Sequence, residues 1–143
     1  ICSSKGLGAP VGSLLIGNRD FSRQGSSGRK LVGGAMRQAG YIAAAGIYAL
    51  KNNVERLADD HRNAAAIAEA LKQNSLTEKV NYGGTNIVIF TLRPGMKASD
   101  YLEKIRARGI LALKTGERSI RMVTHLDVSD AQIREACDIL ATL

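Results

Sequence analysis

Apolar side chains recur at helical spacing through the middle of the chain. Steps of three, four and seven residues separate the members of one apolar set: Ile47, Leu50, Val54, Leu57, Ala64, Ala68 and Leu71. Such spacing marks one face of an α-helix, so the pattern predicts a single long helix over residues 41–74. His61 falls on the same face, and a lone histidine there is interpreted as a packed or hydrogen-bonded side chain rather than a ligand.

The hydrophobic pattern becomes strand-like further along the chain. Residues 85–93 (TNIVIFTLR) are rich in β-branched side chains and end at a Pro-Gly pair, which predicts a strand followed by a turn. Residues 97–109 place apolar side chains on one helical face. We expect Ser99 to be the N-cap of this helix and Gly109 to end it.

The last third of the chain completes an α/β module. Residues 110–115 and 119–126 are predicted to be two strands around a turn at Gly116, and residues 129–143 a closing helix capped by Ser129 or Asp130. The predicted organisation therefore has three parts: a short stub over residues 1–40, a long connecting helix over 41–74, and a small α/β C-terminal domain over 75–143.

The stub carries too few apolar residues to bury a core by itself. Residues 11–17 (VGSLLIG) predict a short buried strand, and the polar, serine-, glycine- and arginine-rich residues 18–30 predict a loop. The chain starts without methionine and enters a loop at once, which indicates a segment that begins inside a domain.

One lysine in the stub has unusual neighbours. Lys5 lies in SSKGLGAPVGS, between serines and a glycine-rich loop. Glycines let a backbone approach a bulky group closely. The lysine is compatible with a surface charge, a phosphate contact or a nucleophilic amine, as in enzymes that use pyridoxal phosphate (PLP). The spacing alone leaves these three alternatives open.

Composition narrows the class of protein. The chain has 143 residues, 45% of them hydrophobic and 23% charged, with a net charge of +7 and no tryptophan. The low aromatic content argues against a base-stacking nucleic-acid binder, and the basic residues are scattered rather than clustered. No apolar run is long enough to cross a membrane, and no secretory signal is recognised at the start. Cys2 and Cys137 suit small apolar roles in a reducing cytoplasm, and their spacing forms no metal site.

Three segments carry a resemblance to a known family. SKGLGAPVGSLLIGNRDF, GGAMRQAGYIAAAGIYAL and RMVTHLDVS together resemble the low-specificity L-threonine aldolases, which are PLP-dependent lyases with an aspartate-aminotransferase-like fold. The likeness runs nearly end to end but covers only the C-terminal portion of such an enzyme. It implies an α/β fold, in which residues 1–40 are the end of the PLP-binding large domain.

The resemblance also implies roles for individual residues. Lys5 matches the family's Schiff-base lysine, with Ser4 as a neighbour of the cofactor. Lys30 matches a lysine that contacts the cofactor phosphate, Arg121 the arginine that pairs with the substrate carboxylate, and Arg37 an arginine near the site. Gly25–Gly28 departs from the family pattern, which leaves the placement of Lys30 open. His125 and Asp127 belong to the third segment and are interpreted as structural.

The implied activity is cleavage of L-threonine or L-allo-threonine to glycine and acetaldehyde, with PLP and without a catalytic metal. The implied partners are the small amino-acid substrate, the N-terminal portion of the same enzyme and further copies in a dimer of dimers, with no nucleic acid or membrane. The alternatives are another PLP lyase or racemase of the same fold and a non-catalytic basic binding module. The fragment alone is expected to be inactive, because most of the cofactor pocket lies upstream.

Overall fold

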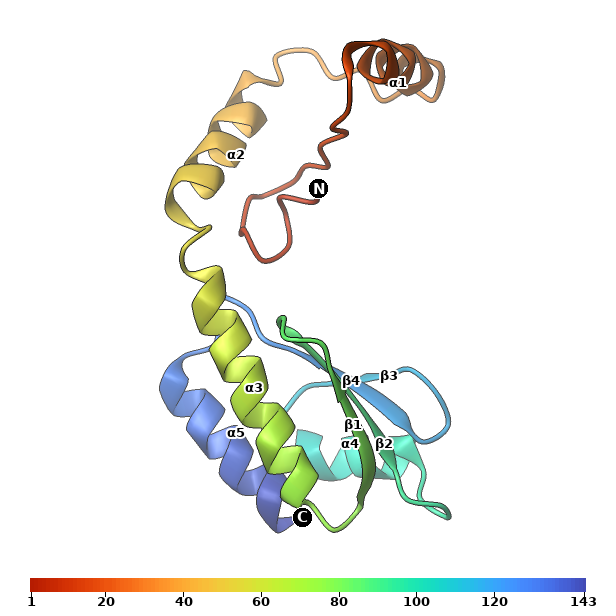
Figure 1. Cartoon of the computed structure of the whole chain (residues 1–143), viewed down its shortest axis with the longest axis vertical. Helices are drawn as coiled ribbons and strands as arrows, with labels where there is room; N and C mark the ends of the chain where they lie inside the picture. The colour runs from red at the N-terminus through yellow and green to blue at the C-terminus, as the bar shows by residue number, and fades with distance from the viewer. The chain divides into compact units, whose positions relative to one another are not determined.

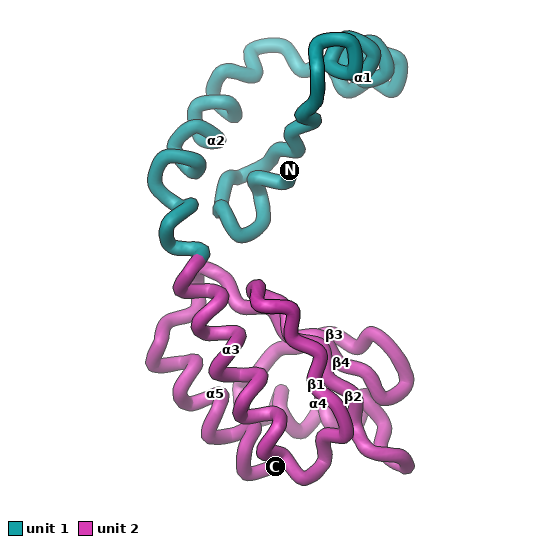
Figure 2. Tube along the Cα trace, in the orientation of Figure 1, with its two compact units in different colours: residues 1–57 teal, residues 58–143 magenta.

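The computed structural model describes all 143 residues and divides them into two compact units. Unit 1 comprises Ile1–Leu57 and unit 2 comprises Ala58–Leu143 (Figure 2). Unit 1 contains helices α1 (Arg19–Leu31) and α2 (Gly40–Asn52), whereas the sheet lies in unit 2. None of the helices is both long and apolar enough to span a bilayer.

Helix α1 replaces the loop that the sequence predicted over residues 18–30. Asn18 caps it, because the Asn18 side chain accepts a hydrogen bond from the Phe21 backbone N–H at 2.9 Å. Asp20 in the first turn and Arg29 and Lys30 in the last turn complement the helix dipole. The favourable cap and the charged residues at the two helix ends therefore outweigh the destabilising effect of the two glycines inside the helix. None of its residues is buried within this chain.

The strand expected at residues 11–17 is also absent, because only one bridge forms there, between Cys2 and Ser13. A strand needs a partner along its length, and residues 11–17 have only that one pairing. Unit 1 accordingly buries very little. Its core consists of Leu7, Ala9 and Ala49, with Leu57 packed against them.

The long helix predicted over residues 41–74 is two helices. Helix α2 ends at Asn52, and α3 (Leu57–Gln73) begins five residues later. Asparagine favours bonds from its side chain to nearby backbone over helix continuation. Here Asn53 donates a hydrogen bond through Nδ2 to the Leu7 carbonyl oxygen at 2.7 Å, which ties the break between the helices to the N-terminal loop.

Unit 2 has a four-stranded antiparallel sheet with helices on one face (Figure 1). Its order is β1-β2-β4-β3, and its remaining elements are β1 (Thr77–Tyr82), β2 (Ile87–Leu92), α4 (Ala98–Arg106), β3 (Leu113–Lys114), β4 (Ser119–Val123) and α5 (Asp130–Thr142). The predicted strand, helix, two strands and helix are thus confirmed. Strand β1 was not predicted, because its only large apolar side chains are Val80 and Tyr82.

Strand alternation decides which side chains face the helices. Val88, Phe90 and Leu92 of β2 are buried, as are Ile120 and Met122 of β4. They pack in one core with residues of the three helices, which include Ala64, Ile67, Ala68, Leu71, Ala98, Tyr101, Ile105, Ile133 and Leu140. Because successive side chains of a strand point to opposite faces, the residues between them lie on the face away from this core.

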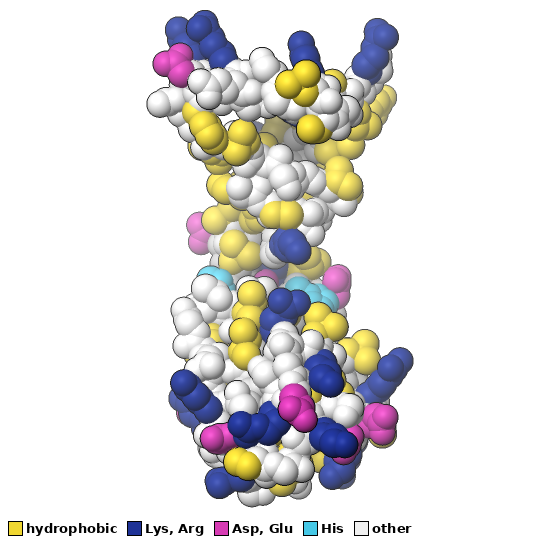
Figure 3. Space-filling model, turned by 90° about the vertical axis from the view of Figure 1, so that its right-hand side faces the viewer, with side chains coloured by type: hydrophobic (Ala, Val, Ile, Leu, Met, Phe, Trp, Pro, Cys, Tyr) yellow, Lys and Arg dark blue, Asp and Glu magenta, His cyan; other side chains and the backbone are white.

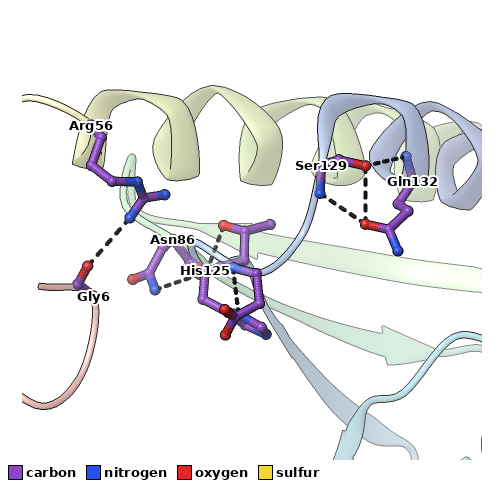
Figure 4. Close-up of polar contacts among 8 residues, drawn as sticks. Gly6, Arg56, Asn86, His125, Ser129 and Gln132 are labelled. Carbon is purple, nitrogen blue, oxygen red and sulfur yellow. Dashed lines mark hydrogen bonds and ion pairs between the residues drawn. The ribbon is translucent and has the colours of Figure 1, made fainter. Parts of the chain in front are cut away.

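The predicted ends of the helices in unit 2 are confirmed at Ser129 and Gly109 and wrong at Ser99. Ser129 caps α5 in a capping box with Gln132 (Figure 4), and Gly109, at φ +84°, follows the end of α4 as predicted. Ser99 is not the cap of α4. The helix begins at buried Ala98, whose backbone N–H donates to the Glu117 carbonyl oxygen, and the Ser99 hydroxyl instead donates to Asp100 at 2.8 Å.

Buried Asn74 links three elements of unit 2. Its Nδ2 group donates to the Tyr101 hydroxyl at 3.2 Å and to the Leu140 carbonyl oxygen, and its Oδ1 atom accepts from the Leu76 N–H at 2.7 Å. Burial raises the pKa of Tyr101 to about 12, so its hydroxyl stays protonated across the physiological range.

We expect Asn74→Ala to destabilise unit 2 by about 2–4 kcal/mol, since it leaves several buried polar groups without partners. Asn81→Ala is the matched control, because Asn81 is exposed on β1, and its cost should be within about 0.5 kcal/mol. Hydrogen exchange of the β2 amides measures both changes. Equal protection in the two variants would contradict this role of Asn74.

Candidate active site

The N-terminal loop that carries Lys5 is closed on itself by backbone hydrogen bonds. The Ser3 N–H donates to the Gly12 carbonyl oxygen at 2.9 Å, and the Ala9 N–H donates to the Ser3 carbonyl oxygen at 3.0 Å. Gly12 has φ +133°, and a Cβ atom there would lie 2.7 Å from the Ser3 Oγ atom. Glycine is therefore required at this position. The loop presents Lys5 on a turn in which the Gly8 N–H donates to the Lys5 carbonyl oxygen at 2.8 Å.

The residues that follow Lys5 are fixed to the rest of unit 1. Leu7 is buried, and its carbonyl oxygen accepts the hydrogen bond from Asn53 described above. The Gly6 carbonyl oxygen accepts a hydrogen bond from Arg56 Nη1 at 3.4 Å (Figure 4). The Lys5 and Ser4 side chains, in contrast, are exposed. The loop therefore holds the lysine backbone in place and leaves its amine accessible.

Cys2 lies beside this turn and was missed as a chemical group by the sequence analysis. Its Sγ atom is 3.3 Å from the Ser4 Oγ atom. The hydrogen bond with the Ser4 side chain is the largest cause that lowers the pKa of the Cys2 thiol, and nearby Lys5 contributes a smaller lowering. Burial in unit 2 raises the pKa of Cys137 instead. No feature of the amino-acid pattern distinguished these two cysteines.

We expect iodoacetamide to alkylate Cys2 faster than Cys137 in the 143-residue chain near pH 8. The thiolate is the reactive form, and a lower pKa gives a larger thiolate fraction at a given pH. Peptide mass spectrometry over time compares the two sites in one sample. Ser4→Ala should slow the reaction at Cys2 and leave Cys137 unchanged, whereas a faster reaction at Cys137 in the unmodified sequence would contradict the assignment.

The other predicted residues of unit 1 lie on separate segments. Lys30 is exposed in the last turn of α1, and Arg37 is exposed in the turn before α2. No hydrogen bond or ion pair joins either of them to Ser4 or Lys5. Their convergence on one ligand stays a prediction.

Arg121 occupies the middle of β4 in unit 2. Its direct cross-strand partners are Ile89 of β2 and Leu113 of β3. Side chains directly opposite each other lie on the same face, so apolar residues flank the guanidinium stem on both sides. The Arg121 Nε atom is buried and has no hydrogen-bond partner, and no acidic side chain pairs with the group. Such an arginine is suited to a planar anion such as a carboxylate. How Arg121 lies relative to Lys5 stays a prediction.

Thr124, rather than His125 or Asp127, anchors the end of β4. The Thr124 hydroxyl donates to the Asp60 carbonyl oxygen at 2.7 Å, and the Thr124 N–H donates to the Asn86 carbonyl oxygen at 3.0 Å. Asn86, which is labelled in Figure 4, donates in turn through Nδ2 to the Thr124 carbonyl oxygen at 2.9 Å. His125 and Asp127 are exposed and contact each other, with Nδ1 3.4 Å from Oδ2. His125 and Asp127, interpreted from the sequence as structural, make their contacts within the turn after β4, whereas Thr124 makes the long-range hydrogen bonds of this strand end. No group of three or more His, Cys, Asp and Glu side chains is placed to hold a metal ion.

Comparison with solved structures defines the class of fold. The chain superposes on an ornithine aminotransferase from Toxoplasma gondii with a TM-score of 0.58 and 21% identity, over 71% of this chain and 25% of the other. It also superposes on an archaeal alanine:glyoxylate aminotransferase with a TM-score of 0.58 and 16% identity, over 94% of this chain and 36% of the other. The fold is therefore that of the PLP-dependent aminotransferases, of which this chain contains a mixed α/β part.

Sequence comparison then gives the family. Residues 1–93 match the model of the beta-eliminating lyases, and the chain belongs to that family. It is 49% identical over 136 residues to the low specificity L-threonine aldolase of Escherichia coli and 34% identical to low-specificity L-threonine aldolase 1 of Arabidopsis thaliana. These alignments cover 94% and 93% of this chain but only 39% and 38% of the relatives. The chain thus spans about two fifths of the length of the curated relatives it matches.

Proposed function

We propose that this chain is the C-terminal section of a PLP-dependent L-threonine aldolase. The observation that carries the proposal is the 49% identity to the Escherichia coli aldolase over 94% of the chain. We call the proposed assembly of this chain with the N-terminal portion the complete enzyme. Its implied reaction cleaves L-threonine or L-allo-threonine to glycine and acetaldehyde. Residues 1–40 then belong to the end of the cofactor-binding domain, and residues 75–143 to the small domain.

The residues of unit 1 fit the chemistry of PLP. An accessible amine on a fixed turn, a neighbouring hydroxyl and exposed cations are the groups that an aldehyde and a phosphate require. Lys5 would hold the cofactor through Nζ, while Ser4 and Lys30 would contact it, Lys30 at its phosphate. PLP, when bound, supplies the electron sink that accepts the bonding pair of the broken Cα–Cβ bond.

Arg121 would hold the substrate carboxylate. A planar guanidinium binds a carboxylate through two parallel hydrogen bonds, which fixes the rotation of the amino acid as well as its position. That rotation determines which bond of Cα is broken. Arg37 would lie near the same carboxylate. The base that takes the β-hydroxyl proton and the side chain that stacks on the cofactor ring belong, in this proposal, to the N-terminal portion.

The apolar surface of unit 1 supports the need for further protein. Helix α2 packs Ala49 against the N-terminal loop, yet Tyr41, Ile47 and Tyr48, on its other faces, are 53–90% exposed. Figure 3 shows hydrophobic side chains at the surface of unit 1, the unit coloured teal in Figure 2. Exposed apolar surface of this extent marks an interaction surface. We propose that the N-terminal portion and further copies, in a dimer of dimers, cover it, and that the protein works in the cytoplasm.

Product analysis tests the proposed activity. The complete enzyme with PLP should release glycine and acetaldehyde from L-threonine, and the 143-residue chain alone should not. Racemisation of L-alanine without threonine cleavage would assign another reaction of the same fold. Threonine cleavage by the isolated chain would show that the N-terminal portion is not required.

A further inference from the structure

A cavity of about 380 Å³ lies within unit 2, on the helix-covered side of the sheet. It is bounded by α3, the segment after α4, the end of β4 and α5. Its floor is apolar, because Ile67, Met122 and Ile133 line it and each is at most 5% exposed. Both the volume and the apolar lining are those of a small-molecule pocket, for which volumes of about 300–1,000 Å³ are usual.

Two opposite charges line this cavity without pairing. Arg108 follows α4, and Glu135 lies on α5, and both side chains line the cavity from exposed positions. No hydrogen bond or ion pair joins the Arg108 and Glu135 side chains to each other or to another residue; the Arg108 backbone N–H donates to the Ile105 carbonyl oxygen at 3.0 Å. An unpaired cation and an unpaired anion beside an apolar floor are complementary to a zwitterion with an apolar side chain.

The other polar side chains of the cavity wall are already engaged. Gln132 accepts hydrogen bonds from the Ser129 backbone and hydroxyl in the capping box (Figure 4). The Thr124 hydroxyl donates to the Asp60 carbonyl oxygen, and His125 faces the Asp127 carboxylate. Arg108 and Glu135 are thus the charged groups of the wall that remain available to a ligand.

We propose that this cavity binds a free amino acid with an apolar side chain. Arg108 receives the carboxylate, Glu135 receives the ammonium group, and the side chain lies on the floor formed by Ile67, Met122 and Ile133. Met122 faces the cavity, whereas Arg121, the preceding residue of β4, faces the opposite side of the sheet. The site therefore does not use Arg121, and it requires neither the cofactor nor the proposed aldolase activity.

Titration of the ¹⁵N-labelled 143-residue chain with L-leucine tests the site by nuclear magnetic resonance. We expect shifts at Gly109, Ile110 and Ala136. L-leucinamide lacks the carboxylate and N-acetyl-L-leucine lacks the ammonium group, so each should bind about tenfold or more weakly, the usual effect of losing one hydrogen bond to a charged group.

Variants assign the two charges. Arg108→Gln should weaken L-leucine about tenfold and leave L-leucinamide unchanged, and Glu135→Gln should do the same for L-leucine and N-acetyl-L-leucine. Arg106→Gln, on exposed α4 surface outside the cavity, is the matched control and should leave all three affinities unchanged.

Three outcomes would overturn the proposal. They are no shifts at millimolar L-leucine, shifts confined to residues outside the cavity wall, and equal affinity for L-leucine and L-leucinamide. Hydrogen exchange in the complete enzyme then shows whether the cavity is occupied by another segment of polypeptide or is open to a small ligand. If residues 108–111 of the complete enzyme are already protected from hydrogen exchange without leucine, and leucine changes nothing, the cavity is filled by polypeptide and the proposal is wrong.

Discussion

Lys5→Ala in the complete enzyme is expected to lower kcat for threonine cleavage by about 1,000-fold or more. In the proposed mechanism the Lys5 amine is the point at which the protein holds PLP, and removal of a covalently acting group has effects of this size. The variant should fold normally, since the exposed Lys5 side chain makes no hydrogen bond in unit 1 and the loop is closed by backbone bonds. Steady-state release of acetaldehyde measures the loss.

Lys104→Ala provides the control for charge removal. Lys104 is exposed on α4 and has no ion pair, so its loss should change kcat by less than twofold or so. Activity of Lys5→Ala close to that of the unmodified enzyme would contradict the role of Lys5, whatever the state of the fold.

Arg121→Gln is expected to lower kcat/KM for L-threonine by roughly 30- to 160-fold, which corresponds to about 2–3 kcal/mol of lost transition-state binding. Glutamine keeps a hydrogen-bond donor but cannot form the charged, two-point contact with a carboxylate. Arg121→Lys should recover only part of the loss, because an ammonium group has no planar fork. The affinity for PLP should not change in either variant.

Arg106→Gln is the matched control, as an exposed arginine outside β4 with no ion pair. It should leave kcat/KM within about twofold of the original. A comparison of threonine with a substrate analogue that lacks the carboxylate adds a direct check. If Arg121→Gln reduces the turnover of both compounds equally, Arg121 does not contact the carboxylate.

The sequence predicted unit 2 better than unit 1 for a physical reason. The strands and helices after residue 85 bury their apolar faces against one another, so their periodicity reflects contacts inside the chain. The break between α2 and α3 was missed because the apolar pattern continues through it, although the Asn52-Asn53 pair was a signal for a helix end. Helix α1 was missed because the serines and glycines of residues 18–30 favoured a loop, and the capping role of Asn18 was not recognised.

The candidate site, like the fold, could be predicted only in part from the sequence. The position of Lys5 in a glycine-rich loop was visible in the sequence, and the structure adds how Asn53 and Arg56, some fifty residues later, fix that loop. Such contacts depend on the fold and leave no trace in spacing. The unpartnered Nε atom of Arg121 results from its burial in the folded sheet, and the lowered pKa of Cys2 results mainly from the orientation of the nearby Ser4 hydroxyl.

Reduction of the PLP-loaded complete enzyme with borohydride, followed by peptide mass spectrometry, tests the central claim most directly. Borohydride makes a C=N bond between a lysine and the cofactor permanent, so the modified residue can be identified. We expect loss of the yellow colour and a pyridoxyl mass on the peptide that contains Lys5. A pyridoxyl mass on another lysine, such as Lys30, with Lys5 unmodified, would contradict it.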